Sequence, residues 1–306
     1  MKIVVFIIAI FIGKFAQGQE IIESDVRINT FVNGTLLQPK NAQDTIAIII
    51  GGSGPTDRNG NQRTSQNNSL KKLAQGLSND GIATFRYDKR IFALIQQNAL
   101  VEEKISFDDF VNDAIAVIDY FNTKGFSTII LVGHSQGALI ATLAAQKRDV
   151  DMLVCIAGAG QTIDKVIVDQ LALQAPGLVD NATQAFTDLK QKGKSEKFNI
   201  GLVSIFRPSV QPFMKTWMRY DPAVELSKLS IPILLVNGSK DLQVNEKEGE
   251  ILKNSNPNAK SIHVKDMNHV LKIIEGDDLE NSKSYNESYR PVATELIEHL
   301  VTFIKS

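Results

Sequence analysis

The chain has 306 residues, of which 43% are hydrophobic and 22% are charged, and its mean hydropathy of −0.06 is typical of a globular protein. This length is sufficient for one large domain with an insertion. The formal net charge of −1 excludes the strongly basic composition with which proteins bind nucleic acids or anionic membrane surfaces.

Residues 1–18 have the pattern of a secretory signal peptide. The apolar run 3–12 is too short to span a bilayer comfortably, and the small residues Ala16 and Gly18 stand at the −3 and −1 positions of a cleavage site. We expect the mature chain to begin at Gln19 and to be periplasmic, extracellular or attached to the cell surface. Its net charge would be about −3, because two lysines and no acid are removed. An uncleaved membrane anchor is the alternative.

The segment after the signal peptide predicts β structure. Loosely alternating hydrophobic residues between 25 and 37, with Asn33-Gly34 as the turn, are typical of a β-hairpin. A loop is expected from Pro39 to Asp44. The wholly apolar run 45–50 then predicts a buried central strand.

A polar loop rich in glycine, 51–60, follows that strand. Glycines let backbone N–H groups approach a ligand closely, so the loop is expected to bind either an oxyanion or a phosphate. The Gly-Lys-Ser/Thr ending of a phosphate loop is missing, which favours the oxyanion. Gly52 and Gly54 are candidate substrate contacts. Asp57 and Arg58 either pair with each other or remain solvated.

The segment 68–125 predicts a helix, a strand and a second helix. Apolar residues at helical spacing mark a helix that begins at Asn68 or Ser69 and ends near residue 79. A strand, 82–87, and a charged run that extends to Arg90 follow. Ser106 is expected to cap the second helix, which ends at Gly125.

The next motif is Gly133-His134-Ser135-Gln136-Gly137, between a β-rich run, 127–132, and a helix-prone run, 138–147. The pattern Gly-x-Ser-x-Gly alone recurs by chance. Between a strand and a helix, however, it predicts a sharp turn that exposes the serine hydroxyl above the sheet. The two glycines are needed because the two backbones approach too closely for a β-carbon. Ser135 is therefore the candidate nucleophile.

A further buried strand, 150–157, contains Cys155, the only cysteine. This cysteine is expected to be an inert core thiol, and export without a disulfide favours a bacterial type of periplasm or surface. The alternation of strands and helices then stops until about residue 230. The interval has helical patterns, and Trp217 and Phe213 in it are candidate substrate-binding residues.

We interpret this interval as a helical cap inserted over the sheet; a long crossover without substrate contact is the alternative. The predicted organisation is a signal peptide, 1–18, a core in two parts, 19–157 and 226–306, and a cap, 158–225.

The alternation resumes with a strand, 231–236, and Asp241 follows it. After a helix and a short strand, His269 lies on a loop. Residues 277–288 are polar and are expected to be exposed. Residues 290–304 predict a closing amphipathic helix.

Ser135, Asp241 and His269 each follow a predicted buried strand. A parallel sheet would bring them to its carboxyl edge, where ligands bind. A serine hydroxyl needs a base within hydrogen-bond reach, and the base needs an acid to fix its tautomer. The chain order Ser, Asp, His is that of α/β-hydrolases. Asp266 is the main alternative acid, and Asp221 is a weaker one.

The other histidines have structural interpretations. His134 lies in the elbow at a position that usually points away from the nucleophile, so packing or a place at the rim is expected. His263 falls within a strand and His299 on the terminal helix. The histidines have no metal-ligand spacing, and neither a metal nor a cofactor is expected.

Together these motifs resemble the α/β-hydrolase superfamily, and in particular its esterase and serine-aminopeptidase-like lipase group, over nearly all of residues 25–306. The chain departs from the family pattern in two places. It has Gly51-Gly52 where the family often has His-Gly, and it has Ile91 where a glycine usually follows the Tyr-Asp-Lys-Arg motif. The motifs that carry the resemblance are Gly52 to Arg58, Arg86 to Arg90, Gly133 to Gly137, Asn237 to Asp241, and Met267-Asn268-His269.

The resemblance implies an α/β-hydrolase fold: a mostly parallel central sheet, helices on both faces and an inserted helical cap. It also implies an oxyanion hole made by the backbone N–H groups of Ser53 and Gln136. The expected activity is hydrolysis of small-molecule carboxylic esters through an acyl-enzyme on Ser135, with His269 as base. The alternatives are a peptidase or amidase, an acyltransferase, or a non-catalytic binding protein of the same fold.

Overall fold

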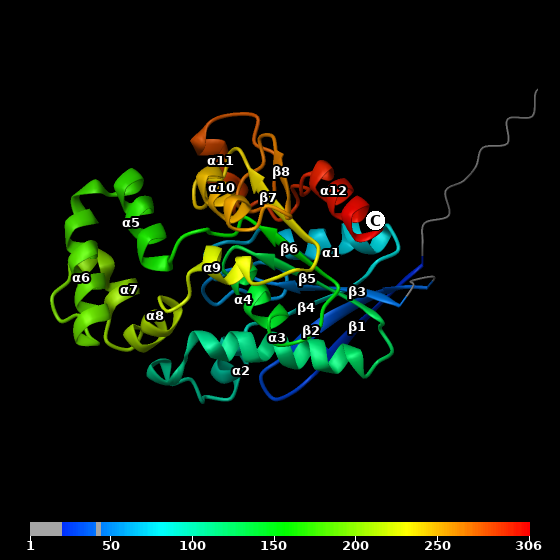
Figure 1. Cartoon of the computed structure of the whole chain (residues 1–306), viewed down its shortest axis with the longest axis horizontal. Helices are drawn as coiled ribbons and strands as arrows, with labels where there is room; N and C mark the ends of the chain where they lie inside the picture. Colours follow the sequence, from blue (N-terminus) through cyan, green and yellow to red (C-terminus); the bar gives the residue numbers. More distant parts are fainter. Residues whose placement is uncertain (1–19, 41–43) are drawn as a thin grey trace, which may run out of the picture.

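A single eight-stranded sheet forms the centre of the molecule in the computed structural model, which describes residues 20–40 and 44–306 (Figure 1). The predicted signal peptide and part of the loop predicted after Pro39 lie outside the described residues. The strands are β1 (Ile21–Arg27), β2 (Asn33–Pro39), β3 (Thr45–Ile50), β4 (Ala83–Tyr87), β5 (Thr128–His134), β6 (Met152–Ile156), β7 (Ile233–Gly238) and β8 (Lys260–Val264).

The strand order in the sheet is β1-β2-β4-β3-β5-β6-β7-β8. The pairs β1–β2 and β2–β4 are antiparallel, and every pair from β4–β3 to β7–β8 is parallel. The carboxyl ends of β3, β5, β6, β7 and β8 therefore meet at one edge of the sheet. The predicted mostly parallel sheet is confirmed.

Helices lie on both faces of the sheet and at one end of it (Figure 1). The α-helices are α1 (Ser69–Asn79), α2 (Arg90–Gln96), α3 (Phe107–Asn122), α4 (Gln136–Ala145), α5 (Ile163–Gln174), α6 (Val179–Lys192), α7 (Val203–Phe206), α8 (Gln211–Trp217), α9 (Pro222–Ser227), α10 (Glu246–Ser255), α11 (Asp278–Ser284) and α12 (Thr294–Ile304). Short 3-10 helices are η1 (Glu102–Lys104), η2 (Pro176–Leu178) and η3 (Ile200–Leu202). None of the helices in the described ranges is both long and apolar enough to cross a bilayer.

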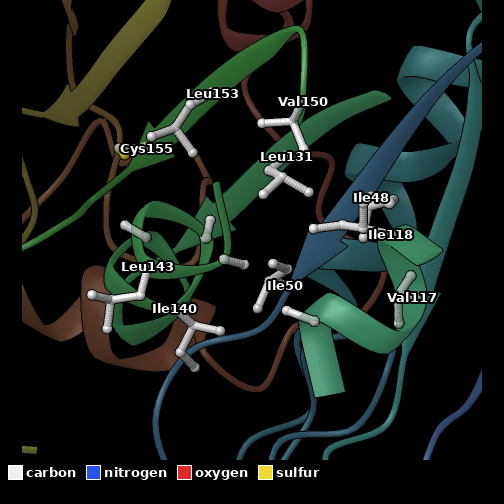
Figure 2. Packing of buried hydrophobic residues seen from close by; sticks show 14 of the residues in the cluster. Ile48, Ile50, Val117, Ile118, Leu131, Ile140, Leu143, Val150, Leu153 and Cys155 are labelled. Atoms are coloured by element: carbon white, nitrogen blue, oxygen red, sulfur yellow. The ribbon is translucent and has the colours of Figure 1, made fainter. Parts of the chain in front are cut away.

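The parallel strands are apolar on both faces because helices cover both. Side chains alternate between the faces of a strand, so Ile48 and Ile50 of β3 pack toward α3 and α4, whereas Ile49 packs toward α1 and α12. Figure 2 shows the first of these layers, in which Ile48, Leu131 and Cys155 lie among side chains from the two covering helices. Cys155 is 3% exposed, and burial raises the pKa of its thiol to about 12. This thiol therefore remains protonated, as expected of a core cysteine.

Helices α5 to α8 form a separate layer at one end of the sheet (Figure 1). They have a small core of their own, which includes Phe186, Phe206 and Met214. Trp217 on α8 joins this layer to the main domain, because its ring stacks on Phe107 of α3 with centroids 5.5 Å apart. The interval between β6 and β7 is thus helical.

Two local predictions were wrong, and that for 277–288 holds only in part. Asn33-Gly34 begins β2, and the hairpin turns earlier, where the side chain of Asn29 accepts hydrogen bonds from the backbone of the two residues before β2. The segment 277–288 is not simply exposed, because it forms α11 with Asn281 and Ser284 buried. The closing helix begins at Thr294 rather than at residue 290. In contrast, the predicted capping of α3 by Ser106 is confirmed as a capping box with Asp109.

Candidate active site

Ser135 occupies a strained turn between β5 and α4. Its φ of 55° and ψ of −121° lie outside the favoured regions for a residue with a side chain, a conformation that costs about 1–3 kcal/mol. The glycines on either side make the turn possible. A β-carbon on Gly133 would lie 2.3 Å from the carbonyl oxygen of Gly137, and one on Gly137 would lie 2.2 Å from that of Ile50.

The glycine-rich loop after β3 lies beside this turn. A β-carbon built on Gly52 would be 3.2 Å from Cβ of Ser135. The next residue, Ser53, has its carbonyl oxygen bonded by Thr56 and Gln62, each at 2.9 Å, so the loop is held closed. Among the described residues, no oxygen accepts the backbone N–H of Ser53 or of Gln136. Two free N–H groups therefore flank Ser135.

Asp241 and His269 form a buried pair. Nδ1 of His269 donates to Oδ2 of Asp241 at 2.8 Å, and the two side chains are 6% and 1% exposed, with the histidine the more exposed of the two. The other carboxylate oxygen accepts the backbone N–H groups of Gln243 at 2.8 Å and Val244 at 2.9 Å. Burial by itself would raise the pKa of Asp241, but His269 and these hydrogen bonds hold it below the usual value. The carboxylate is therefore charged and fixed against the imidazole.

His134 connects this pair to the elbow. Its Nε2 donates to the backbone oxygen of His269 at 2.8 Å, and the two rings have centroids 4.9 Å apart. Burial, together with the neighbouring His269, lowers the pKa of His134 to about 3, so the ring is neutral. Because His134 immediately precedes Ser135, this contact holds the His269 loop against the elbow.

Asn268 anchors the same loop, and its role was not predicted from the sequence. Its Oδ1 accepts the backbone N–H groups of Val270 and Lys272, and its Nδ2 donates to Asn281 and Ser284 of α11 at 2.8 and 2.7 Å. Asn281 and Ser284 of α11 are therefore buried as partners of the histidine loop. An available signal was the asparagine directly before the candidate base, since asparagine side chains often satisfy loop backbone.

A cavity of about 180 Å³ opens at Ser135. Ser53 and Gln136 line it near the nucleophile, and Trp217 lines it from the helical layer. One face of α5 completes the wall with residues spaced like a helix stripe: Ile163, Val166, Ile167 and Gln170. The segment between β6 and β7 thus contributes directly to the cavity. Asp241 and His269 are buried and are not part of its wall.

Three candidate substrate contacts do not line the cavity. Phe213 is used in packing, because its ring lies between those of Phe107 and Phe110, at 6.3 and 5.8 Å. Gly54, with a φ of +80°, lies against Gln62. Gly52 is buried behind Ser53 against the elbow. The periodicity of a helix does not reveal which neighbour its aromatic face meets, which explains the error for Phe213.

The predicted pairing of Asp57 with Arg58 is also wrong. Arg58 instead binds Asp88 through two side-chain contacts of 3.0 and 2.6 Å, and Asp25 at 2.8 Å. Asp57 accepts the backbone N–H groups of Asn59 and Asn61 and so shapes its own loop.

The alternative acids have other surroundings. Asp266 has a φ of 57°, and its backbone, rather than its carboxylate, makes the hydrogen bonds to Ser239 and Ile274. Asp221 caps α9.

The two remaining histidines lie outside the site. His263 and His299 are each near a glutamate, at 3.7 and 3.4 Å, and are half exposed. In the ranges that the structure describes, no cluster of three His, Cys, Asp or Glu side chains is arranged to hold a metal ion.

Comparison with known proteins agrees with this architecture. Est1E from Butyrivibrio proteoclasticus superposes with a TM-score of 0.57 at 18% identity, covering 93% of this chain and 99% of Est1E. A Pyrococcus furiosus esterase gives 0.53 at 16% identity, covering 94% and 91%. The chain has the α/β-hydrolase fold. The predicted fold is thereby confirmed.

Comparison of sequences finds two further similarities. The profile of the family described as "Serine aminopeptidase, S33" matches residues 63–199. Esterase EstD of Thermotoga maritima is 30% identical over 265 residues, which are 83% of this chain. The match spans 61% of the length of EstD.

Proposed function

We propose that the protein is a serine esterase that hydrolyses small, neutral carboxylic esters. The observation that carries the proposal is the buried Asp241–His269 pair held against a strained serine elbow. A histidine oriented by an acid in this way can activate a serine that lies within its hydrogen-bond reach. The similarity to EstD, which is named an esterase, supports the same reaction.

We infer the proton transfers from the orientation of His269. Nδ1 of His269 is occupied by Asp241, so Nε2 takes the proton of the Ser135 hydroxyl. As Oγ bonds to the ester carbon, the π electrons of the carbonyl move to its oxygen, which the N–H groups of Ser53 and Gln136 bind. The carbon–oxygen bond to the alcohol then breaks, and His269 gives its proton to the leaving alcohol. Water, deprotonated by His269, releases the acid and restores Ser135.

The cavity indicates the substrate class. Its volume of about 180 Å³ is below the 300–1,000 Å³ of sites for drug-sized ligands. None of the described residues that line it is charged, and the wall combines aliphatic side chains with Gln161, Gln170 and Gln243. A short, uncharged acyl or alcohol group therefore fits better than a long fatty chain or a charged peptide end.

The test is hydrolysis of p-nitrophenyl esters with acyl chains of increasing length by the wild type and by Ser135→Ala. We expect acetate and butyrate to be the best substrates and the variant to lose at least about 10³-fold in kcat. Activity that survives in Ser135→Ala would contradict the proposal. Equal rates on butyrate and palmitate would contradict the small cavity but not the nucleophile.

A peptidase is the second candidate, because the matching family profile is that of a serine aminopeptidase. The cavity wall, as described, has no carboxylate to pair with the free, charged amino group of a peptide. Amino-acid p-nitroanilides compared with the corresponding p-nitrophenyl esters distinguish the two. Faster turnover of the anilides would replace the esterase proposal with the peptidase.

A further inference from the structure

Lys89 is a buried lysine whose side chain reaches the residue after the nucleophile. It follows β4 by two positions and is 4% exposed. Its Nζ donates to Oε1 of Gln136 at 2.5 Å, across 47 residues of sequence. The charged run after β4 thus supplies a cation to the elbow. This cation takes no part in the proton transfers of the proposed reaction.

This cation has no carboxylate partner among the described residues. Nζ lies 4.8 Å from the centroid of the Phe110 ring. The acid whose charge acts on it is Asp113, but both oxygens of Asp113 are held by Arg90, at 2.8 and 2.7 Å. An uncompensated buried charge is destabilising. Burial accordingly lowers the pKa of Lys89 to about 7, with Asp113 opposing the shift only in part.

The position of Lys89 increases the free-energy cost of its buried positive charge. Gln136 is the first residue of α4, and the N-terminus of a helix carries a partial positive charge. The protonated Lys89 therefore adds a second positive charge near a positive helix end, and no carboxylate of the described residues is paired with it. The charge that would compensate both is a negative one at the carbonyl oxygen of a group bonded to Ser135.

Gln136 depends on Lys89 for its orientation. Its Nε2 is buried and has no acceptor among the described residues, so the only hydrogen bond of the side chain is the one at Oε1. Because the protonated form of Lys89 can only donate, it determines which side of the amide faces it. The side chain that belongs to the proposed oxyanion donor is thus held by a single ammonium group.

We propose that Lys89 is a positioning residue for acyl transfer at Ser135: it fixes Gln136 and supplies positive charge that favours the oxyanion over the neutral ester. This inference rests on the proposed function. Through Lys89, the Arg86–Arg90 run helps to stabilise the transition state, although Lys89 does not touch the substrate.

The test compares the wild type with Lys89→Met, which keeps the aliphatic length and removes the charge. We expect kcat for p-nitrophenyl acetate to fall roughly 10- to 100-fold, less than the loss expected for a direct oxyanion donor, while KM changes by less than about threefold. Phenylboronic acid forms an anionic tetrahedral adduct with a serine, so its affinity should fall by the same factor as kcat. The melting temperature should change little, because the relief from an unpaired buried charge offsets the lost hydrogen bond to Gln136.

The matched control is Lys147→Met, which removes an exposed positive charge near the other end of α4. It should leave kcat and boronate affinity unchanged. A purely structural role of Lys89 predicts a lower melting temperature with an unchanged kcat for the folded fraction, and that result would overturn the proposal. An equal loss of boronate affinity in both variants would also overturn it, since only net charge would then matter.

The rate at which a fluorophosphonate labels Ser135 separates this inference from the proposed function. Phosphonylation develops the same negative charge but does not require an ester substrate. If wild-type protein labels but cleaves no ester, the esterase proposal fails, and slower labelling of Lys89→Met still supports the role of Lys89. If wild-type Ser135 does not label, both proposals are refuted.

Discussion

At the residue scale, two aspartates close to His269 in space or in sequence have opposite surroundings. Asp241 is nearly inaccessible, and its carboxylate accepts three hydrogen bonds, one of them from the imidazole. Asp266 is three residues from His269 in sequence, yet only its backbone is held. Nearness along the chain therefore does not identify the acid.

We predict that Asp241→Ala lowers kcat for p-nitrophenyl acetate by roughly 10³- to 10⁴-fold, because His269 loses the acceptor that fixes its tautomer. Asp266→Ala is the matched control and should retain at least about half of the activity. Steady-state kinetics on both folded variants gives the answer. A larger loss in Asp266→Ala would reassign the acid.

At the scale of elements, the active-site edge depends on how closely β3, β5 and α4 approach one another. The shortest approach is at Gly137, where a β-carbon would meet the Ile50 carbonyl at 2.2 Å. That oxygen belongs to the backbone of a central strand and has no freedom to move. The glycines of the elbow are thus required by packing, independently of the proposed catalytic role of Ser135.

We predict that Gly137→Ala destabilises the protein by at least about 3 kcal/mol, since the added methyl group overpacks a site between two backbones. Gly177, in η2, is the matched control, because a methyl group added there would have no atom within 4 Å. Gly177→Ala should change the free energy of unfolding by less than about 1 kcal/mol. Urea unfolding followed by circular dichroism measures both, and equal midpoints would disprove this account of the elbow.

At the scale of the whole molecule, the cavity lies between the sheet domain and the helices inserted after β6. Trp217 has two functions there, because it stacks on Phe107 and also lines the cavity. Phe213, one turn earlier on α8, packs on the same Phe107 ring without reaching the cavity. Substituting Phe213 therefore tests only the packing of the helical layer, whereas substituting Trp217 also changes the shape of the cavity.

We predict that Trp217→Ala moves the optimum of the p-nitrophenyl ester series from about two to four carbons toward about six to eight, because the cavity grows by most of an indole ring. Phe213→Ala should cost a similar amount of stability, about 3 kcal/mol, and keep the wild-type optimum. Specificity constants across the series, with melting curves, measure both effects. An unchanged optimum in Trp217→Ala would mean that the acyl group binds elsewhere.

The sequence alone was sufficient for the features that depend on local chemistry. Alternating and continuous apolar runs located the strands, and the Ser106 capping box and the Gly-x-Ser-x-Gly elbow depend on residues only a few positions apart. Parallel strands then have to present Ser135, Asp241 and His269 at one edge, because the carboxyl ends of such strands coincide.

The features that failed depend on contacts between distant segments. Phe213 and Trp217 have the same helical spacing, but only the docking of α8 on α3 decides which of them faces the cavity. Arg58 binds Asp25 and Asp88 rather than its neighbour Asp57. Asn281 is buried within an otherwise mostly accessible polar segment, because it is a partner of Asn268.

The amino-acid order by itself determined the fold class, the elbow and the three candidate residues, since strand periodicity and turn chemistry act over short distances. The tertiary structure decided which polar groups satisfy one another and what encloses the site. The contact between Lys89 and Gln136 is the clearest case. The role of the buried ammonium group depends on its hydrogen-bond partner, which lies 47 residues away in sequence and is brought to it only by folding.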